Sequence, residues 1–230
     1  MKSAQTIFIK QAKDTFRNPM VLVMFLVFPA VALVMTQLVA KTNDDIPDSM
    51  FVTMMAAIFA GMGLITSMAG IIAEDIERKS LRLLVMAGVK PHEYLLGAGG
   101  FILLMGTVTS LAFAFMGGFA WIEFLKFLAV MITGTAASVV LGAAVGMFAK
   151  NQQSATALGM PIAMILGFTP MIANFNATVE KLSGFLYTQQ LNVIANDFSA
   201  NFGKAMLVML ANIAVLTILF GVAYKNCTAA

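Results

Sequence analysis

The densest group of ionisable side chains in the 230-residue sequence lies in one short segment between two apolar stretches. Acidic residues come first and basic residues follow, so that Glu74 stands four positions before Arg78 and Asp75 four before Lys79. On a helix, acid-before-base pairs at this spacing attract each other, each by a few tenths of a kcal/mol. The pattern predicts a charged helix from residue 74 to Gly88, where glycine favours an end.

Apolar side chains within this predicted helix form a patch of Leu81, Leu84 and Val85 among the charges. An apolar patch that faces the cytosol needs a partner to cover it. Alternatively, the same side chains dip into the membrane interface. The sequence leaves both possibilities open.

Residues suited to covalent chemistry are scarce. The only histidine, His92, lies in a polar loop beside Pro91 and Glu93, and the only cysteine, Cys227, is near the C-terminus. A hydrolase needs a nucleophile and a base within reach of each other. ATP hydrolysis would need a Gly-x-x-x-x-Gly-Lys-Ser/Thr loop, which the sequence lacks. We therefore predict that the protein is not an enzyme and binds no cofactor or metal of its own.

Six apolar stretches make up most of the chain, of which 60% is hydrophobic and 11% charged, with a mean hydropathy of +0.90. A helix needs roughly 20 apolar residues to cross the hydrocarbon of a bilayer, where it satisfies its own backbone hydrogen bonds. We predict an all-α integral membrane protein. Its membrane domain, residues 19–230, is expected to cross at 20–40, 51–73, 95–120, 127–148, 158–173 and 205–224.

These six stretches contain no Asp, Glu, Lys, Arg or His. Proton-coupled carriers place such groups near the middle of the membrane, so this class is disfavoured. A carrier that binds sodium through the backbone carbonyls of broken helices needs no charged side chain and stays an alternative.

Lysines and arginines fall mainly on one side of the predicted spans. With the N-terminus inside, only Lys41, Lys126, Lys181 and Lys204 lie outside. The positive-inside rule then predicts a multi-pass protein of the plasma membrane with both termini in the cytoplasm. Because the rule also explains the net charge of +3, we predict no nucleic-acid partner.

Residues 1–18 have the pattern of an amphipathic helix that lies on the cytoplasmic surface, with membrane lipid as its partner. The expected apolar face holds Ala4, Ile7, Phe8, Ala12 and Phe16, opposite Lys10, Lys13 and Arg17. Asn18 and Pro19 then favour the start of the first span.

Small residues recur at every fourth position of the fourth span, at Gly134, Ser138, Gly142 and Gly146. Such a ladder allows a second helix to approach closely. Packing within the chain is the favoured interpretation, and packing against another copy is the alternative.

The fifth span contains Pro161, Gly167 and Pro170, so it is either one full helix or a re-entrant pair of half-helices. The segment that follows, residues 174–204, is too long for a turn and too polar to cross. It predicts one or two short helices at the outer surface that shape an exit path. The expected outer gate comprises Pro170, Asn174, Phe185, Gln189 and Gln190.

Taken in order, these features resemble the membrane permease subunits of ABC-2 type ATP-driven exporters. The resemblance covers nearly the whole chain and rests on four features: a surface helix running into Arg17-Asn18-Pro19, the segment Glu74-Asp75-Ile76-Glu77 with its leucines, the restart Val89-Lys90-Pro91 before Leu95-Leu96-Gly97, and the proline-containing fifth span with its outer helices. Family members often have a Gly-Thr pair where this chain has Lys79-Ser80.

The resemblance implies that residues 74–88 form a coupling helix seated in a groove of a separate ATP-binding subunit, which would bind the ATP. The coupling residues would be Glu74, Asp75, Glu77, Arg78, Leu81, Leu84 and Val85. It also implies a second permease subunit, identical or similar, and outward transport of a hydrophobic or amphipathic cargo such as a drug, an antimicrobial peptide or a lipid. A non-transporting membrane scaffold or immunity protein and the sodium-coupled carrier are the alternatives.

Overall fold

The computed structural model describes residues 2–43 and 46–229, and every regular element within these ranges is a helix. Met1 and Ala230, the ends of the predicted segments 1–18 and 19–230, lie outside the described residues. Six helices are long and apolar enough to cross a membrane, which confirms the predicted all-α membrane class. They are Leu22–Thr42, Met50–Glu77, Pro91–Met116, Trp121–Met147, Gln152–Ala173 and Phe202–Lys225.

In chain order the elements are α1 (Lys2–Arg17), α2 (Pro19–Leu38), η1 (Ala40–Thr42), α3 (Met50–Ile58), η2 (Phe59–Gly63), α4 (Leu64–Glu77), α5 (Ser80–Met86), α6 (Pro91–Tyr94), η3 (Leu95–Gly99), α7 (Gly100–Met116), α8 (Trp121–Met147), α9 (Gln152–Ala173), α10 (Ala177–Ser183), α11 (Tyr187–Asn196) and α12 (Phe202–Ala229). The third, fourth and fifth long helices begin earlier than predicted, at Pro91, Trp121 and Gln152. The reason is that an apolar stretch marks the part of a helix suited to hydrocarbon, whereas the helix itself continues into polar residues.

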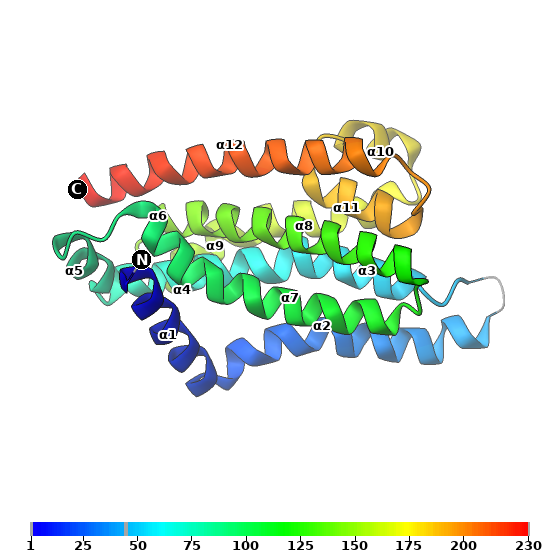
Figure 1. Ribbon diagram of the computed structural model, residues 1–230, viewed down its shortest axis with the longest axis horizontal. Coiled ribbons are helices and arrows are strands. Elements are labelled where there is room, and N and C mark those ends of the chain that lie inside the picture. Colours follow the sequence, from blue (N-terminus) through cyan, green and yellow to red (C-terminus); the bar gives the residue numbers. More distant parts are fainter. Residues whose placement is uncertain (1, 44–45, 230) are drawn as a thin grey trace.

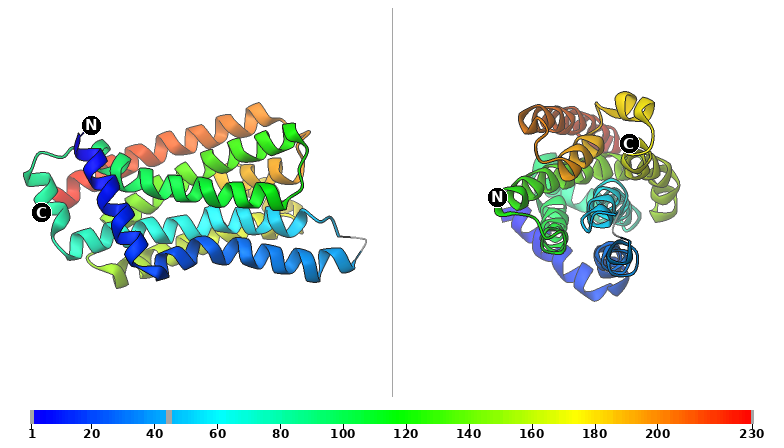
Figure 2. Two further views of the ribbon diagram at one scale, coloured as in Figure 1. Left: turned by 60° about the horizontal axis from the view of Figure 1, so that its bottom comes forward. Right: turned by 90° about the vertical axis from the view of Figure 1, so that its right-hand side faces the viewer.

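The long helices run side by side, and the short ones gather at the two ends of the bundle (Figure 1). One end, here called the terminal end, carries both chain termini together with α1, α5 and α6. The opposite end, the distal end, carries α10 and α11. Viewed along the bundle, α2 and α12 lie on opposite sides of it (Figure 2).

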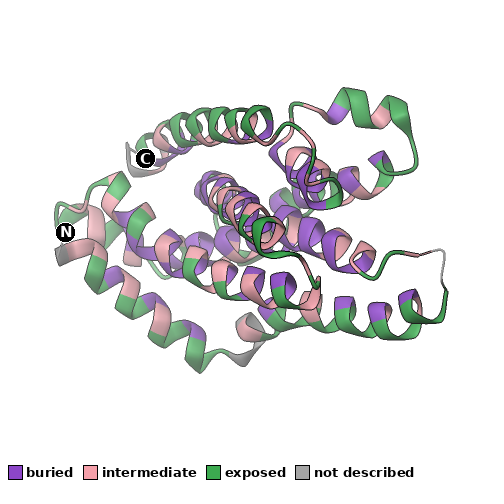
Figure 3. Cartoon of the chain, turned by 45° about the vertical axis from the view of Figure 1, so that its right-hand side comes forward, coloured by how far each residue is buried: buried purple, intermediate pink, exposed green. Residues whose placement is uncertain are grey.

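Burial separates central helices from peripheral ones (Figure 3). In the most apolar window of each span, 72% of the residues are buried in Met50–Glu77 and 67% in Trp121–Met147, against 17% in the first and last spans. The second and fourth spans therefore form the core, and α2 and α12 expose apolar faces along the perimeter.

The small-residue ladder of α8 faces other helices of the same chain. A Cβ added to Gly142 would lie 2.6 Å from the Ile65 carbonyl oxygen, and one added to Gly146 would lie 2.7 Å from the Cβ of Ile72. Further along, a Cβ on Gly134 would meet Leu191 at 2.7 Å. Glycine therefore lets α8 lie directly against the backbone of α4 and leaves room for a side chain of α11.

Two spans contain a π-helical turn that the sequence analysis did not predict, η2 in the second and η3 in the third. A π turn interrupts the regular backbone hydrogen bonding of an α-helix. In η2 the carbonyl of Ala60 accepts a hydrogen bond from Ser138 Oγ at 2.5 Å. Ser138 has one hydroxyl proton, so Tyr187 Oη, 2.9 Å away, donates to Ser138. The π turn is thereby tied to both α8 and α11.

The fifth span is one helix of 22 residues, α9, and not a pair of half-helices. Pro161 and Pro170 lie inside it. Proline removes a backbone donor, but neighbouring helices support such a helix in membrane proteins. Here the support comes from η2, since a Cβ on Gly61 would lie 2.8 Å from the Cα of Gly167.

Two short helices, α10 and α11, occupy the predicted outer segment. The helix α10 begins where Asn176 Oδ1 accepts from the backbone N–H of Thr178 and Val179. The helix α11 is largely buried against α8, α9 and α12, so it is part of the packed bundle.

We expect Gly142→Ala to lower the free energy of unfolding by about 1–3 kcal/mol, because the new Cβ forces α4 away from α8. The thermal midpoint of the purified protein in detergent, followed by size-exclusion chromatography after heating, measures this effect. Gly221→Ala is the matched control, since nothing lies within 4 Å of a Cβ added there. Equal midpoints for the two variants would contradict the tight contact.

Candidate functional site

The charged segment is not one helix from residue 74 to Gly88, as predicted, but two. The helix α4 ends at Glu77, and α5 begins at Ser80. Between them Lys79 has a φ of 58°, in the left-handed region that glycine adopts most easily. The Gly-Thr pair of the resembling family stands at this position, so the chain puts lysine into a turn suited to glycine.

Of the two predicted ion pairs along this segment, one forms. Arg78 contacts Glu74 at 2.8 Å. The pairing of Asp75 with Lys79 was wrong, because the left-handed turn takes Lys79 out of the helix and Asp75 points inward with 5% of its surface exposed.

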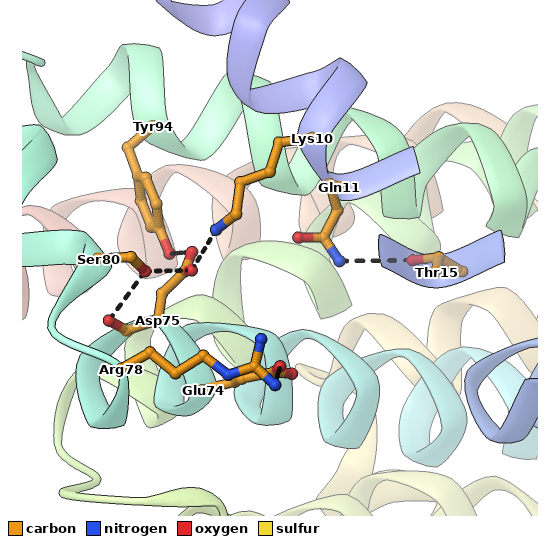
Figure 4. A network of polar contacts seen from close by, with 8 residues as sticks. All are labelled: Lys10, Gln11, Thr15, Glu74, Asp75, Arg78, Ser80 and Tyr94. Carbon is orange, nitrogen blue, oxygen red and sulfur yellow. Dashed lines mark hydrogen bonds and ion pairs between the residues drawn. The ribbon is translucent and has the colours of Figure 1, made fainter. Parts of the chain in front are cut away.

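The carboxylate of Asp75 is the centre of a buried polar cluster (Figure 4). Lys10 Nζ lies 2.5 Å from Oδ1, Ser80 Oγ donates to Oδ1 at 2.6 Å, and Tyr94 Oη donates to Oδ2 at 2.8 Å. A buried charge is costly unless it is paired and hydrogen-bonded, and here it has both kinds of partner. This Asp75 cluster joins α1, α4, α5 and α6 through one side chain.

The helix α1 docks on the bundle with part of its predicted apolar face, since Ile7 is buried in the core and Phe8 and Ala12 pack against it. Ile7, Gln11 and Thr15 are its buried side chains, and Phe16 is exposed. Lys10, placed by the prediction on the solvent face, reaches Asp75 instead. Glycine at position 97 allows α1 to approach η3 closely, since a Cβ added there would lie 2.6 Å from the Cβ of Ile7. Its location at the membrane surface stays a prediction.

The predicted apolar patch of α5 packs against the protein itself. Leu81 is buried in the core, and Leu84 and Val85 pack against it. The exposed apolar side chains are Leu83, at 62%, and Met86, at 69%. The physical reason is the break at Lys79, which resets the helical register.

Glu77 contacts a further span. Its Oε2 accepts a hydrogen bond from the backbone N–H of Gln152 at 3.1 Å, at the start of α9. A carboxylate at a helix N-terminus is stabilised by the unpaired N–H groups there. The α4–α5 junction is therefore connected to α9 as well as to α1 and α6.

The predicted gate residues lie at the distal end, and the structure brings only some of them together. Asn174 and Gln189 line one pocket of about 490 Å³. Pro170 is buried in α9, Phe185 is exposed, and Gln190 donates to the Gly184 carbonyl at 2.5 Å; these three are not among the pocket's lining residues.

Sequence reasoning missed Ser80 and Tyr94 as partners of Asp75, and Asn192 and Asn196 in the distal pocket. One signal for the first group was available, because Asp75 follows Ile71 and Ile72 on the same helical face. A carboxylate on an apolar face needs donors from neighbouring elements.

Among the described residues, no group of three or more His, Cys, Asp or Glu could hold a metal ion. What the terminal end offers is a short exposed helix, α5, fixed to three other helices by one buried carboxylate.

Comparison with known protein families matches residues 2–194 to the ABC-2 type transporter family. No curated protein matches the chain.

We expect Lys10→Met to loosen α1, because it leaves the buried Asp75 carboxylate without its charged partner. The cost should be about 1–3 kcal/mol, as for other hydrogen bonds to charged groups. Hydrogen exchange in the backbone of α1 and α5 should rise. Lys13→Met, at an exposed lysine of the same helix, is the matched control, and equal exchange in both variants would argue against the cluster.

We expect Lys79→Val to destabilise the junction by about 1–2 kcal/mol, since a β-branched residue resists a positive φ. Lys79→Gly should keep or raise the thermal midpoint. Lys90→Val tests for a general effect of losing a lysine, because Lys90 is extended with a φ of −81°. A midpoint for Lys79→Val as high as that of Lys79→Gly would be inconsistent with the left-handed turn.

Proposed function

Because the chain belongs to the ABC-2 type transporter family, we propose that it is the permease subunit of an exporter driven by ATP hydrolysed on a separate ATP-binding subunit. One observation carries this proposal. The helix α5 exposes Leu83 and Met86 next to exposed basic residues, while its other face is anchored in the protein. An exposed apolar pair on an anchored helix is a surface that a partner protein covers.

The Asp75 cluster supports the proposal that movement of α5 is transmitted to the membrane spans. A partner that displaces α5 displaces Ser80, which is bonded to Asp75 at the end of the second span. Asp75 is in turn bonded to Tyr94 at the start of the third span and to Lys10 of α1. Movement of α5 therefore moves these helices together, since separating them would remove hydrogen-bond or ion-pair partners from a buried carboxylate. The energy comes from contacts that differ between the ATP-bound and ATP-free partner.

We place the terminal end in the cytoplasm of a cell whose plasma membrane the bundle spans. Basic residues gather there, in α1, in the α4–α5 junction and at Lys150 between α8 and α9. Only Lys41, Lys126, Lys181 and Lys204 belong to the distal side, which fits the positive-inside rule.

The perimeter helices support a second permease subunit, identical or similar, with lipid around it. Both α2 and α12 expose long apolar faces, with Leu26 at 67% and Ile218 at 69%. A path between two such faces suits a hydrophobic or amphipathic cargo.

We expect the double substitution Leu83→Ala and Met86→Ala to abolish ATP-dependent export while leaving the fold intact, because both side chains are exposed. The measurement is uptake of labelled amphiphile into inverted membrane vesicles, together with co-purification of the ATP-binding subunit. Leu96→Ala removes an equally exposed leucine at the same end and should behave as the unmodified protein.

Export by the double variant at the normal rate would contradict the proposal. Co-purification of a protein other than an ATPase would favour the membrane scaffold or immunity protein. Transport driven by a sodium gradient without ATP would favour the sodium-coupled carrier.

A further inference from the structure

The distal pocket lies where four elements meet. Met50 at the start of α3, Asn174 after α9, Glu180 of α10 and Gln189 of α11 all line it, and its volume is about 490 Å³. It is separate from the Asp75 cluster, which lies at the other end of the bundle (Figure 1).

One wall of the pocket is a chain of hydrogen-bonded amides. Thr53 Oγ1 donates to Asn196 Oδ1 at 2.9 Å, Asn196 Nδ2 to Asn192 Oδ1 at 3.0 Å, and Asn192 Nδ2 to Asn174 Oδ1 at 2.7 Å. This series of hydrogen bonds fixes the side chains and directs the amide donors of Asn192 and Asn196 toward their neighbours. Buried polar networks of this kind hold their members in place.

Gln189 is the exception in this wall. Its side chain lines the pocket and is only 2% exposed, yet Oε1 has no hydrogen-bond partner within residues 2–43 and 46–229. A buried carbonyl left unpaired is unfavourable, because it has lost its hydrogen bonds to water. A ligand that donates a hydrogen bond would recover this free energy.

The charge of the pocket favours a cation. Glu180 and Asp197 line it, and no lysine or arginine is among its lining residues. Hydrogen bonds from Ser199 Oγ and N, at 2.5 and 2.9 Å, lower the pKa of Asp197 and keep it ionised. The charge of Lys126 also lowers the pKa of Asp197, and its Nζ donates to the Phe198 carbonyl at 2.6 Å.

Apolar side chains complete the lining. Met50, Val193 and Phe175 border the polar wall, and Phe175 is 73% exposed. An alkyl chain attached to the cation would lie against them.

We propose that this pocket binds the primary ammonium group of a cationic amphiphile, with Gln189 Oε1, Glu180 and Asp197 as acceptors and the apolar side chains against its alkyl part. An ammonium carries several N–H donors and one positive charge, which complements these acceptors. The identification of the bound amphiphile as an exported cargo rests on the proposed export function, whereas its binding to the pocket does not.

The test uses the full-length chain in phosphatidylcholine nanodiscs, with radiolabelled hexylamine as the probe and hexanol as the neutral analogue. We expect saturable binding of hexylamine only. Glu180→Gln and Gln189→Met should each weaken it at least tenfold. Asp48→Asn removes an exposed carboxylate at the same end and is the matched control.

Two further arms distinguish the source of the ammonium. Competition by phosphatidylethanolamine added to the nanodiscs identifies a lipid headgroup as the occupant. ATP-driven release of hexylamine from proteoliposomes that contain the ATP-binding subunit identifies an exported cargo. Non-saturable binding, or equal binding by the unmodified protein and Glu180→Gln, would overturn the pocket. Binding without any ATP-driven export would leave the pocket in place and count against the proposed function alone.

Discussion

A single buried carboxylate, Asp75, sets the arrangement of the terminal end. In lipid, apolar contact between helices gives little net driving force, so polar contacts and close packing decide which helices lie together. The donors to Asp75 come from α1, α5 and α6. If one of these helices left, the buried carboxylate would lose a hydrogen bond or its charged partner, at a cost of about 1–3 kcal/mol. This one side chain therefore adds to the apolar packing of Ile7 and Leu81 in holding their positions.

Inside the spans the constraint is different, because backbone groups need partners and helices need close approach. The Ala60 carbonyl of the π turn η2 finds its partner in Ser138, and Gly61 brings η2 against Gly167 of α9. The same close contact supports α9, which stays one helix although it contains two prolines. Small residues at Gly142 and Gly146 perform the same task between α4 and α8.

The sequence predicted the spans and the two distal helices well, because both follow from runs of apolar residues and their interruption. It failed where the outcome depends on contacts between distant segments. Lys79 interrupts the charged helix with a left-handed φ, a conformation that the presence of a lysine does not predict. Beyond the interruption, Leu81 is buried and Leu83 is exposed. Lys10 has a solvent-face position on α1, but Asp75, far along the chain, offers it a buried partner.

The second span connects the two ends of the molecule. It carries Asp75 near its terminal end and Thr53, the partner of Asn196, near its distal end. A helix of 28 residues is about 40 Å long. Its tight contacts with Gly142 and Gly146 lie between these two points. Because Thr53 is bonded to Asn196 in a wall of the distal pocket and Asp75 is bonded to Ser80 of α5, one continuous span joins the two sites.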